Sequence, residues 1–493
     1  MTPRTFLNAN VAFLLLILAA GPLAAQTVVG IRGSQFTING QPTYSAAQGF
    51  PAANPLIEGT LLNVRAVQAI FDDANYPRGG SKAHPYLSPA MGPVAFDYPN
   101  GPFSAARNTR EFLAALPAWR RAGVLAFTVN LQGGGPVDGN FGLHGEPQPQ
   151  ANSAFGPHGN LKAAYADRLR QVIATADQLH MVVIVGFFYF GSEHLVDQAP
   201  HDAYARKAVR QASLFLKNLP HRNVLIEIAN EISLNGYEHP ILKAGGVLQA
   251  VRLAQKTVER QIPVSFSWTG PLPPRNTAAD AAFRAADFVM FHTNGQTPRQ
   301  VSNQIARMRA QFGSNRPLLI NEDGVSTFNL WAAVEHHVGW GFYDQGLNNY
   351  HDGFQSPPVN WNINTLTKWI FFEQVARLTG SPVPPRPASS SPALAVIRVS
   401  GLTPKATVPA IAAIRAGVTA SNPMWPVKRV EFFVDNQPYS YCSDAACRIG
   451  EPMPWQQKPQ DGKHTLRVVA YLRRGPAFSE TAVMTEIPFT LKR

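Results

Sequence analysis

Two segments of the sequence each place an asparagine directly before a glutamate at the end of an apolar run. The first is VLIEIANE, which ends in Asn230 and Glu231, and the second is PLLINEDG, which contains Asn321 and Glu322. Apolar runs of this kind are typical of strands in a buried parallel sheet. A carboxylate at the end of such a strand lies either at a solvated rim or in a site. Two such carboxylates brought together could divide the work of a general acid and a nucleophile.

Strand-like runs alternate with helix-like segments on both sides of these pairs. Eight units of this kind predict a (β/α)8 TIM barrel. The predicted strands are Ala66–Phe71, Val124–Asn130, Met181–Phe190, Val224–Asn230, Pro263–Trp268, Phe288–His292, Pro317–Asn321 and Gly339–Tyr343. Before them, the Asn39-Gly40 pair in GSQFTINGQPTYS indicates a hairpin with a type I′ turn, which we expect to cap the barrel floor.

The order of the strands places the two glutamates on opposite sides of the predicted barrel. Glu231 follows the fourth strand and Glu322 follows the seventh. In such barrels the active site lies at the C-terminal ends of the strands, so the two carboxylates should face each other across the mouth. Facing carboxylates are what hydrolysis of a glycosidic bond needs, because one protonates the leaving oxygen and the other attacks.

The segment from about residue 27 to 378 resembles the clan A glycoside hydrolases, the 4/7 superfamily that includes family 5-like cellulases and mannanases. The resemblance rests on VLIEIANE and PLLINEDG. It implies a retaining enzyme in which Glu231 is the acid/base and Glu322 is the nucleophile. It also implies that Asn230 binds the sugar 2-hydroxyl.

The chain departs from that family at several positions. Ile232 stands where the family usually has proline, and Asp323 stands where it has an aromatic residue. The sixth strand ends in His292-Thr293-Asn294, which lacks the usual tyrosine, and the third strand lacks the usual histidine. These differences leave the sugar, the linkage and the endo or exo mode of action open.

Further polar and aromatic residues follow the predicted strands and are candidates for substrate contact. Carboxylates and amides can bond sugar hydroxyls, and aromatic rings can stack on sugar faces. Rim-solvated acids and core aromatics are the alternative interpretation. The candidates are Asp72, Asp73, Asn130, Gln132, Trp268, His292, Trp340 and Tyr343.

The N-terminus has the features of a secretory signal peptide over residues 1–25. Arg4 precedes a short apolar block, and small residues end it near Ala25. The block is too short to span a bilayer, and no later run of about 18 apolar residues exists. We therefore expect a soluble protein that is secreted or periplasmic, without a membrane span.

A Pro/Ser-rich segment, residues 379–395, divides the chain. It is typical of a linker between the barrel, residues 26–378, and a smaller part, residues 396–493. The smaller part alternates with period two and predicts a β-sandwich. VKRVEFFVDNQPYS and GKHTLRVVAYLRRG resemble bacterial immunoglobulin-like modules appended to exported enzymes. We expect a spacer with carbohydrate binding as the alternative, and a disulfide between Cys442 and Cys447.

Composition excludes several other classes of function. The net charge is +12, but Lys and Arg are scattered and no nucleic-acid module is recognisable. No G-x-S-x-G, H-E-x-x-H or phosphate-binding loop motif is present. We therefore expect a carbohydrate substrate, no nucleic acid, no cofactor and no metal. The alternative is a non-catalytic glycan-binding or cell-surface protein on a degenerate barrel; loss of either glutamate would favour it, and both are present.

Overall fold

The computed structural model describes most of the chain after the predicted signal peptide. The described residues are 27–72, 98–133, 153–190, 202–234, 236–313, 315–346, 350–355, 357–388, 394–411, 414–443, 445–456, 458–473 and 480–493. The predicted signal peptide, residues 1–25, lies outside them, as does the candidate residue Asp73. Over the described ranges, no helix combines the length and the apolar character that crossing a membrane requires.

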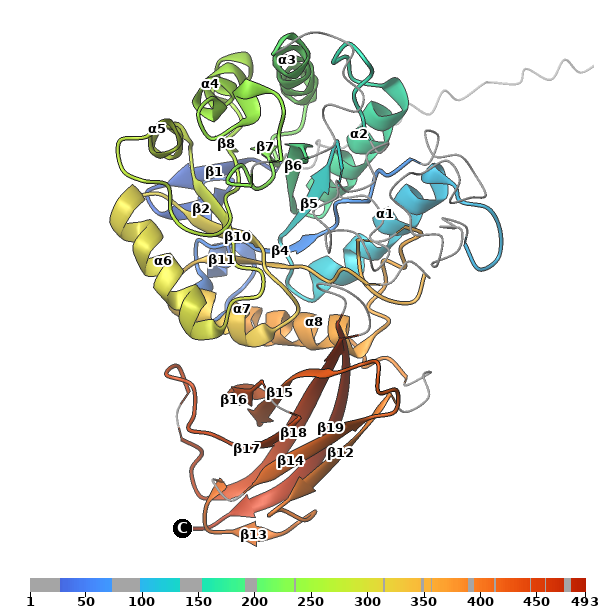
Figure 1. The fold of residues 1–493 in the computed structure, drawn as a ribbon, viewed down its shortest axis with the longest axis vertical. Helices are drawn as coiled ribbons and strands as arrows, with labels where there is room; N and C mark the ends of the chain where they lie inside the picture. Colours follow the sequence, from blue (N-terminus) through green and yellow to red (C-terminus); the bar gives the residue numbers. More distant parts are fainter. Residues whose placement is uncertain are drawn as a thin grey trace, which may run out of the picture.

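Eight parallel strands form the central sheet, in the order β8-β7-β6-β5-β4-β11-β10-β9 (Figure 1). The strands are β4 (Leu62–Arg65), β5 (Ala126–Asn130), β6 (Val182–Phe188), β7 (Val224–Ala229), β8 (Val264–Ser265), β9 (Val289–His292), β10 (Leu318–Glu322) and β11 (Gly339–Phe342). The segments that contain the two outer strands of this order, β8 and β9, are joined by backbone hydrogen bonds from Asp287 N to Val264 O at 2.9 Å and from His292 N to Trp268 O at 2.8 Å. The sheet therefore closes into a barrel.

A helix follows each strand and covers the outside of the barrel (Figure 1). The helices are α1 (Ala105–Arg121), α2 (Ala163–Gln178), α3 (Ala203–Asn218), α4 (Val247–Thr257), α5 (Ala278–Ala285), α6 (Pro298–Phe312), α7 (Thr327–Glu335) and α8 (Leu366–Thr379). This alternation confirms the predicted (β/α)8 TIM barrel, with β7 as its fourth strand and β10 as its seventh.

The first barrel strand lies earlier in the chain than we predicted. It is β4, Leu62–Arg65. Ala66 and Val67 each keep one backbone hydrogen bond to β5, and the chain then turns, with Ala69 N bonded to Ala66 O at 3.0 Å. Ala66–Phe71 as a strand is therefore wrong. The apolar side chains of this run are buried in the core, so their apolar character reflects burial and not a strand. The true strand, β4, contains the polar residues Asn63 and Arg65, which do not fit the apolar pattern used to find strands.

A small antiparallel sheet precedes the barrel: β1 (Val29–Arg32), β2 (Gln35–Ile38) and β3 (Gln41–Pro42). Asn39 and Gly40 both have positive φ, 52° and 77°, as a type I′ turn requires. The ring of Phe36 packs edge-on against Phe288, immediately before β9, at 5.5 Å. The hairpin therefore lies at the N-terminal ends of the barrel strands, as predicted.

The C-terminal part consists of two β-sheets with a hydrophobic core of their own. Its strands are β12 (Ala395–Ser400), β13 (Thr407–Val408), β14 (Arg415–Ala420), β15 (Val427–Val434), β16 (Gln437–Cys442), β17 (Ala446–Arg448), β18 (Gly462–Arg473) and β19 (Glu480–Leu491). An all-β sandwich thus follows the barrel, as predicted. The disulfide between Cys442 and Cys447 is confirmed and links β16 to β17.

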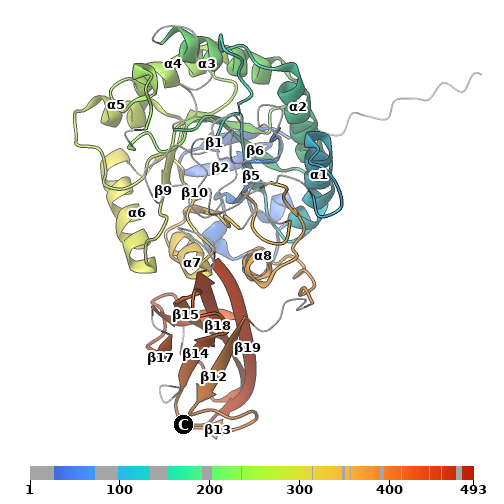
Figure 2. The ribbon, with the colours of Figure 1, turned by 45° about the vertical axis from the view of Figure 1, so that its right-hand side comes forward.

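The sandwich packs directly against α7 and α8 of the barrel (Figure 2). Phe328 of α7 makes edge contacts with Phe433 and Tyr441, at 5.5 and 5.6 Å. Arg467 of β18 forms a buried ion pair with Glu373 of α8. The linker also packs, since Pro384 O accepts a hydrogen bond from Trp369 of α8 at 3.0 Å. This contact is far more extensive than a spacer on a free linker predicts.

Candidate active site

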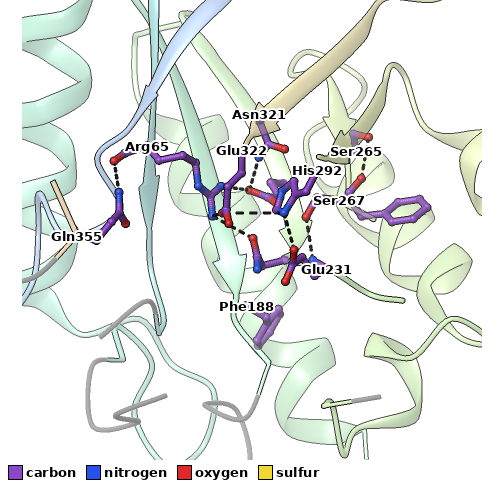
Figure 3. A network of polar contacts seen from close by, with 12 residues as sticks. Arg65, Phe188, Glu231, Ser265, Ser267, His292, Asn321, Glu322 and Gln355 are labelled. Atoms are coloured by element: carbon purple, nitrogen blue, oxygen red, sulfur yellow. Dashed lines mark hydrogen bonds and ion pairs between the residues drawn. The ribbon is translucent and has the colours of Figure 1, made fainter. Parts of the chain in front are cut away.

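Glu231 and Glu322 meet at the C-terminal end of the barrel (Figure 3). Glu322 is the last residue of β10, and Glu231 comes two positions after the end of β7. One carboxylate oxygen of each lies within 4.8 Å of the other. Glu231 has a left-handed φ of 49°, and its N–H donates to Ser267 Oγ at 2.8 Å. Strain of this kind costs about 1–3 kcal/mol and persists where the surroundings fix it.

Arg65, at the end of β4, is fully buried and contacts side chains of both β7 and β10. Its Nη2 lies 2.8 Å from Glu322 Oε2 and donates to Asn230 Oδ1 at 3.0 Å. Its Nη1 lies 3.4 Å from Oε2 of Glu227, an inward-facing residue of β7. Asn321 donates to the same oxygen at 3.2 Å. One guanidinium therefore pairs with two buried carboxylates, which limits the cost of burying each charge.

Sequence reasoning missed both Arg65 and Glu227. Glu227 lies inside VLIEIANE, where a charged residue in an otherwise apolar strand was the available signal. Arg65 precedes the predicted first strand, Ala66–Phe71, so the sequence pattern does not place it at a strand end. Charged residues are almost never fully buried unless they are paired. A charged residue inside a buried strand therefore indicates a network of paired side chains.

Both oxygens of Glu322 accept hydrogen bonds from strong donors. Oε2 faces Arg65, and Oε1 accepts from Asn294 Nδ2 at 3.1 Å. Burial raises the pKa of the Glu322 carboxyl above its ordinary value, while the charges of Arg65 and His292 act in the opposite direction. The pKa direction alone would make Glu322 the protonated partner. The geometry favours the ionised form, since a carboxyl proton would have to point at one of two donors.

His292, at the end of β9, lies between the two glutamates. Its Nδ1 is 2.9 Å from Glu231 Oε1 and 3.9 Å from Glu322 Oε2. Burial lowers the pKa of this imidazole, but the charge of Glu322 and the hydrogen bond with Glu231 outweigh it and raise the pKa above its ordinary value. His292 can therefore carry a proton beside Glu231 near neutral pH.

Asn230 offers an unused donor in the same place. It is 2% exposed, and its Oδ1 accepts from Arg65. Its Nδ2 is buried and has no hydrogen-bond partner within the part of the chain that the structure describes. Leaving a buried donor unsatisfied costs about 1–3 kcal/mol, so this amide is poised for a ligand oxygen.

Two tyrosines lie in the electric field of the pair. Burial, and then the negative charge of Glu322, raise the pKa of Tyr343 well above its ordinary value. Burial, Tyr343 and Glu322 do the same for the pKa of Tyr189, directly after β6. Both phenols therefore keep their protons. Tyr343 was predicted for the site; Tyr189 was missed, although it lies at the end of the third predicted strand.

Three other predicted residues lie at or just after the ends of β5 and β8. Asn130 ends β5 and is buried, and an added Cβ on Gly186 would lie 2.3 Å from its Oδ1. That glycine makes room for Asn130 beside Glu227. Gln132 donates to Ser153 Oγ at 3.2 Å. Trp268 is 7% exposed and donates to Pro271 O at 2.7 Å.

Asp72 and Trp340 are not brought together with the carboxylates. Asp72 pairs with Arg168 of α2 at 2.9 Å. Trp340 is fully buried between strands and helices, where its ring packs against Phe371 of α8 and its Nε1 donates to Asp323 Oδ2 at 2.8 Å. Asp72 is therefore paired with a helix of the barrel's outer layer, and Trp340 takes part in the packing between the barrel and α8. The candidate Asp73 lies outside the described residues.

Asp323 gives a pH-dependent contribution to stability. Burial raises its pKa to about 7, against about 4 in an unfolded chain. The folded protein therefore binds this proton more tightly, and its free energy of unfolding should fall as pH rises from about 4 to about 7. In Asp323→Asn this decrease in the free energy of unfolding between pH 4 and pH 7 should be smaller, by a few kcal/mol at most, since one pKa unit is worth about 1.4 kcal/mol. Urea unfolding at pH 4 and pH 7 measures the free energy of unfolding of both proteins. An equal change with pH in the variant and the wild type would contradict the prediction.

Glu231, His292 and Glu322 offer three potential metal-ligand atoms within 4.8 Å of one another. The guanidinium of Arg65 already lies 2.8 Å from Glu322 Oε2. A second cation at this carboxylate would be repelled by the first at close range. The donor set therefore fits a metal ion poorly and fits a pair of carboxylates used in acid and nucleophile roles well.

No protein-family model or curated protein matches the chain, whereas several solved structures match it at low sequence identity. An endo-β-1,4-mannanase from Thermotoga petrophila is 12% identical, with a TM-score of 0.39 over 78% of this chain and 95% of that one. A β-1,4-D-mannanase from Cryptopygus antarcticus is 14% identical, with a TM-score of 0.38 over 64% and 88%. A β-glucuronidase from Bacteroides uniformis is 11% identical, with a TM-score of 0.38 over 94% of this chain and 48% of its own. Sequence identities and TM-scores this low give no information about the activity of this chain.

Proposed function

We propose that this protein is a retaining glycoside hydrolase with Glu322 as nucleophile and Glu231 as acid/base. The observation that carries the proposal is the distance between them: one oxygen of each carboxylate lies within 4.8 Å of the other. Retaining enzymes hold their carboxyl groups about 5–5.5 Å apart, whereas inverting enzymes leave about 6.5–9.5 Å for a water molecule.

In the first step, Glu322 would attack the anomeric carbon while Glu231 protonates the departing glycosidic oxygen. The C–O bond to the leaving group breaks as the bond to Glu322 forms, which gives a covalent glycosyl-enzyme. His292, whose Nδ1 lies 2.9 Å from Glu231 Oε1, can help to supply that proton. Asn230 Nδ2 would donate to the sugar 2-hydroxyl.

In the second step, Glu231 would take a proton from water, and the hydroxide formed would release the sugar from Glu322 with net retention. Glu322 carries no charge while it is esterified, so Arg65 loses one of its two counterions. Glu227, 3.4 Å from Arg65 Nη1, still pairs with it. This second carboxylate keeps the guanidinium compensated throughout the cycle, which avoids an unpaired buried charge.

The substrate class proposed is an oligo- or polysaccharide, cleaved outside the cytoplasm. The disulfide Cys442–Cys447 supports an oxidising compartment, secreted or periplasmic, in agreement with the signal peptide pattern of residues 1–25. The sugar and the linkage depend on loops around the mouth.

The test is a covalent trap. The protein is incubated with activated 2-deoxy-2-fluoro glycosides chosen after a screen on plant, algal and bacterial glycans. We expect the mass of one sugar to appear on the peptide that contains Glu322, and the first product to keep the anomeric configuration of the substrate. Glycan binding without hydrolysis would support the non-catalytic alternative, and an inverted first product would refute the mechanism.

Asn294 should matter because it donates to the proposed nucleophile. Asn294→Ala removes one hydrogen bond to a charged group, worth about 1.5–3 kcal/mol, so kcat/KM should fall by about 10- to 150-fold. The loss of this donor should also raise the pKa of Glu322 and move the acidic limb of the kcat/KM profile to higher pH. Asn294→Gln is the control that keeps an amide. An unchanged acidic limb would show that Asn294 does not act on Glu322.

A further inference from the structure

The segment that leaves Glu322 runs directly to the C-terminal sandwich. Glu322 ends β10, and α7 begins at Thr327 after only four residues. The last of these, Ser326, donates its hydroxyl to Oε1 of Glu431 on β15 at 2.7 Å. The two residues are 105 positions apart in sequence. A side chain of the sandwich thus holds the loop that follows the proposed nucleophile.

Glu431 is itself firmly held in the interface. It is fully buried, and its Oε1 also accepts from Arg429 Nε at 2.8 Å. Arg429 in turn pairs with Glu480 and lies 3.9 Å from the centre of the Tyr471 ring. A buried carboxylate depends on its few donors, because losing one costs much of its compensation. Ser326 therefore binds an acceptor that has little freedom to move.

Ser326 is used differently from an ordinary helix cap. It has the extended backbone of an N-cap residue, φ −74° and ψ 113°, but its side chain accepts no hydrogen bond from α7. Serine at this position usually accepts from an N–H in the first helical turn. Here its hydroxyl donates across the domain boundary instead. The negative charge of Glu431 beside the start of α7 also matches the positive end of the helix dipole.

The same segment is bonded to the barrel at its other end. Asp323 N donates to Gly341 O at 3.2 Å, and Tyr343 N donates to Gly324 O at 3.2 Å. The segment therefore connects Glu322 with the end of β11, which carries Tyr343 into the site. A displacement at Ser326 would act on both residues through a short, hydrogen-bonded stretch.

We propose that the sandwich belongs to the catalytic unit, with Glu431 as a positioning residue that fixes Glu322 through Ser326. The inference rests on the proposed function, because it assigns Glu322 to the chemistry. It gives the domain contact a role that a spacer does not have. The part of the barrel that the sandwich holds is the loop of residues 323–326.

The test compares variants at this contact with a matched variant elsewhere in the interface. Ser326→Ala removes the hydroxyl, Ser326→Thr keeps it, and Glu431→Gln keeps the size of the side chain without its charge. The control is Glu373→Gln, since Glu373 is an equally buried carboxylate that joins α8 to Arg467 without touching residues 322–326. Full-length proteins are compared by kcat, KM, melting temperature and amide hydrogen exchange.

We expect Ser326→Ala and Glu431→Gln to lower kcat by about tenfold with little change in KM, because a small misplacement of a reacting group is costly. Amide exchange over residues 322–326 should become faster in both. Ser326→Thr should restore both readouts. Glu373→Gln should lower the melting temperature but leave kcat and this exchange at the wild-type level.

Two outcomes would overturn the proposal. One is wild-type kcat and exchange in Ser326→Ala; the other is an equal loss of kcat in Glu373→Gln, which would indicate a general interface effect. If the wild-type protein hydrolyses no glycan, the proposed function fails. The positioning role of Glu431 is then tested by amide hydrogen exchange alone. Faster exchange at 322–326 in Ser326→Ala but not in Glu373→Gln then supports the positioning role, and equal exchange refutes it.

Discussion

Replacing Glu322 by alanine should abolish turnover on every substrate. The variant loses the atom that forms the covalent bond, so kcat should fall by about 10⁴-fold or more, as for other residues that act as nucleophiles. It also loses a counterion of Arg65, but Glu227 remains at 3.4 Å, so the fold should persist. The measurement is kcat on an activated aryl glycoside, with circular dichroism and melting temperature to show that the barrel is intact.

Chemical rescue sharpens this test. The alanine leaves space beside the anomeric carbon, and azide or formate could occupy it and attack in place of the carboxylate. The rescued product should then have inverted configuration, because only one displacement occurs. Glu58→Ala is a matched control, since Glu58 is exposed and lies four residues before the start of β4, toward the end of the barrel opposite the mouth. If Glu322→Ala turned over substrate at the wild-type rate, Glu322 would not be the nucleophile.

The placement of the two carboxylates could be predicted from the sequence because local rules determine it. An apolar strand that ends in a polar pair, counted within a strand–helix alternation, gives both the strand number and the end of the barrel. The same counting does not depend on where each strand begins. Glu231 and Glu322 therefore came together although the first strand was placed four residues too late in the chain.

Two kinds of information were beyond the sequence patterns. In GWGFY the alternation of faces places Trp340 and Phe342 toward α8 and Tyr343 toward the site, but the letters alone do not say which set points inward. Contacts between distant segments leave no local pattern at all. Arg65 with Glu322, and Ser326 with Glu431, are pairs of this second kind, and both concern the proposed nucleophile.

Replacing Glu231 by alanine should affect substrates according to their leaving groups. A sugar leaving group needs a proton, so kcat/KM on a natural oligosaccharide should fall by about 10²–10⁴-fold, the usual contribution of a general acid. An activated aryl glycoside leaves as a stable anion, so its first step should be far less affected. Glu231→Gln keeps the size of the side chain and the hydrogen bond with His292 and serves as the matched variant. The comparison requires kcat/KM for both variants on both substrates, beside Glu322→Ala. If Glu231→Ala loses activity in equal proportion on the two substrates, Glu231 does not protonate the leaving group and the assignment of roles is wrong.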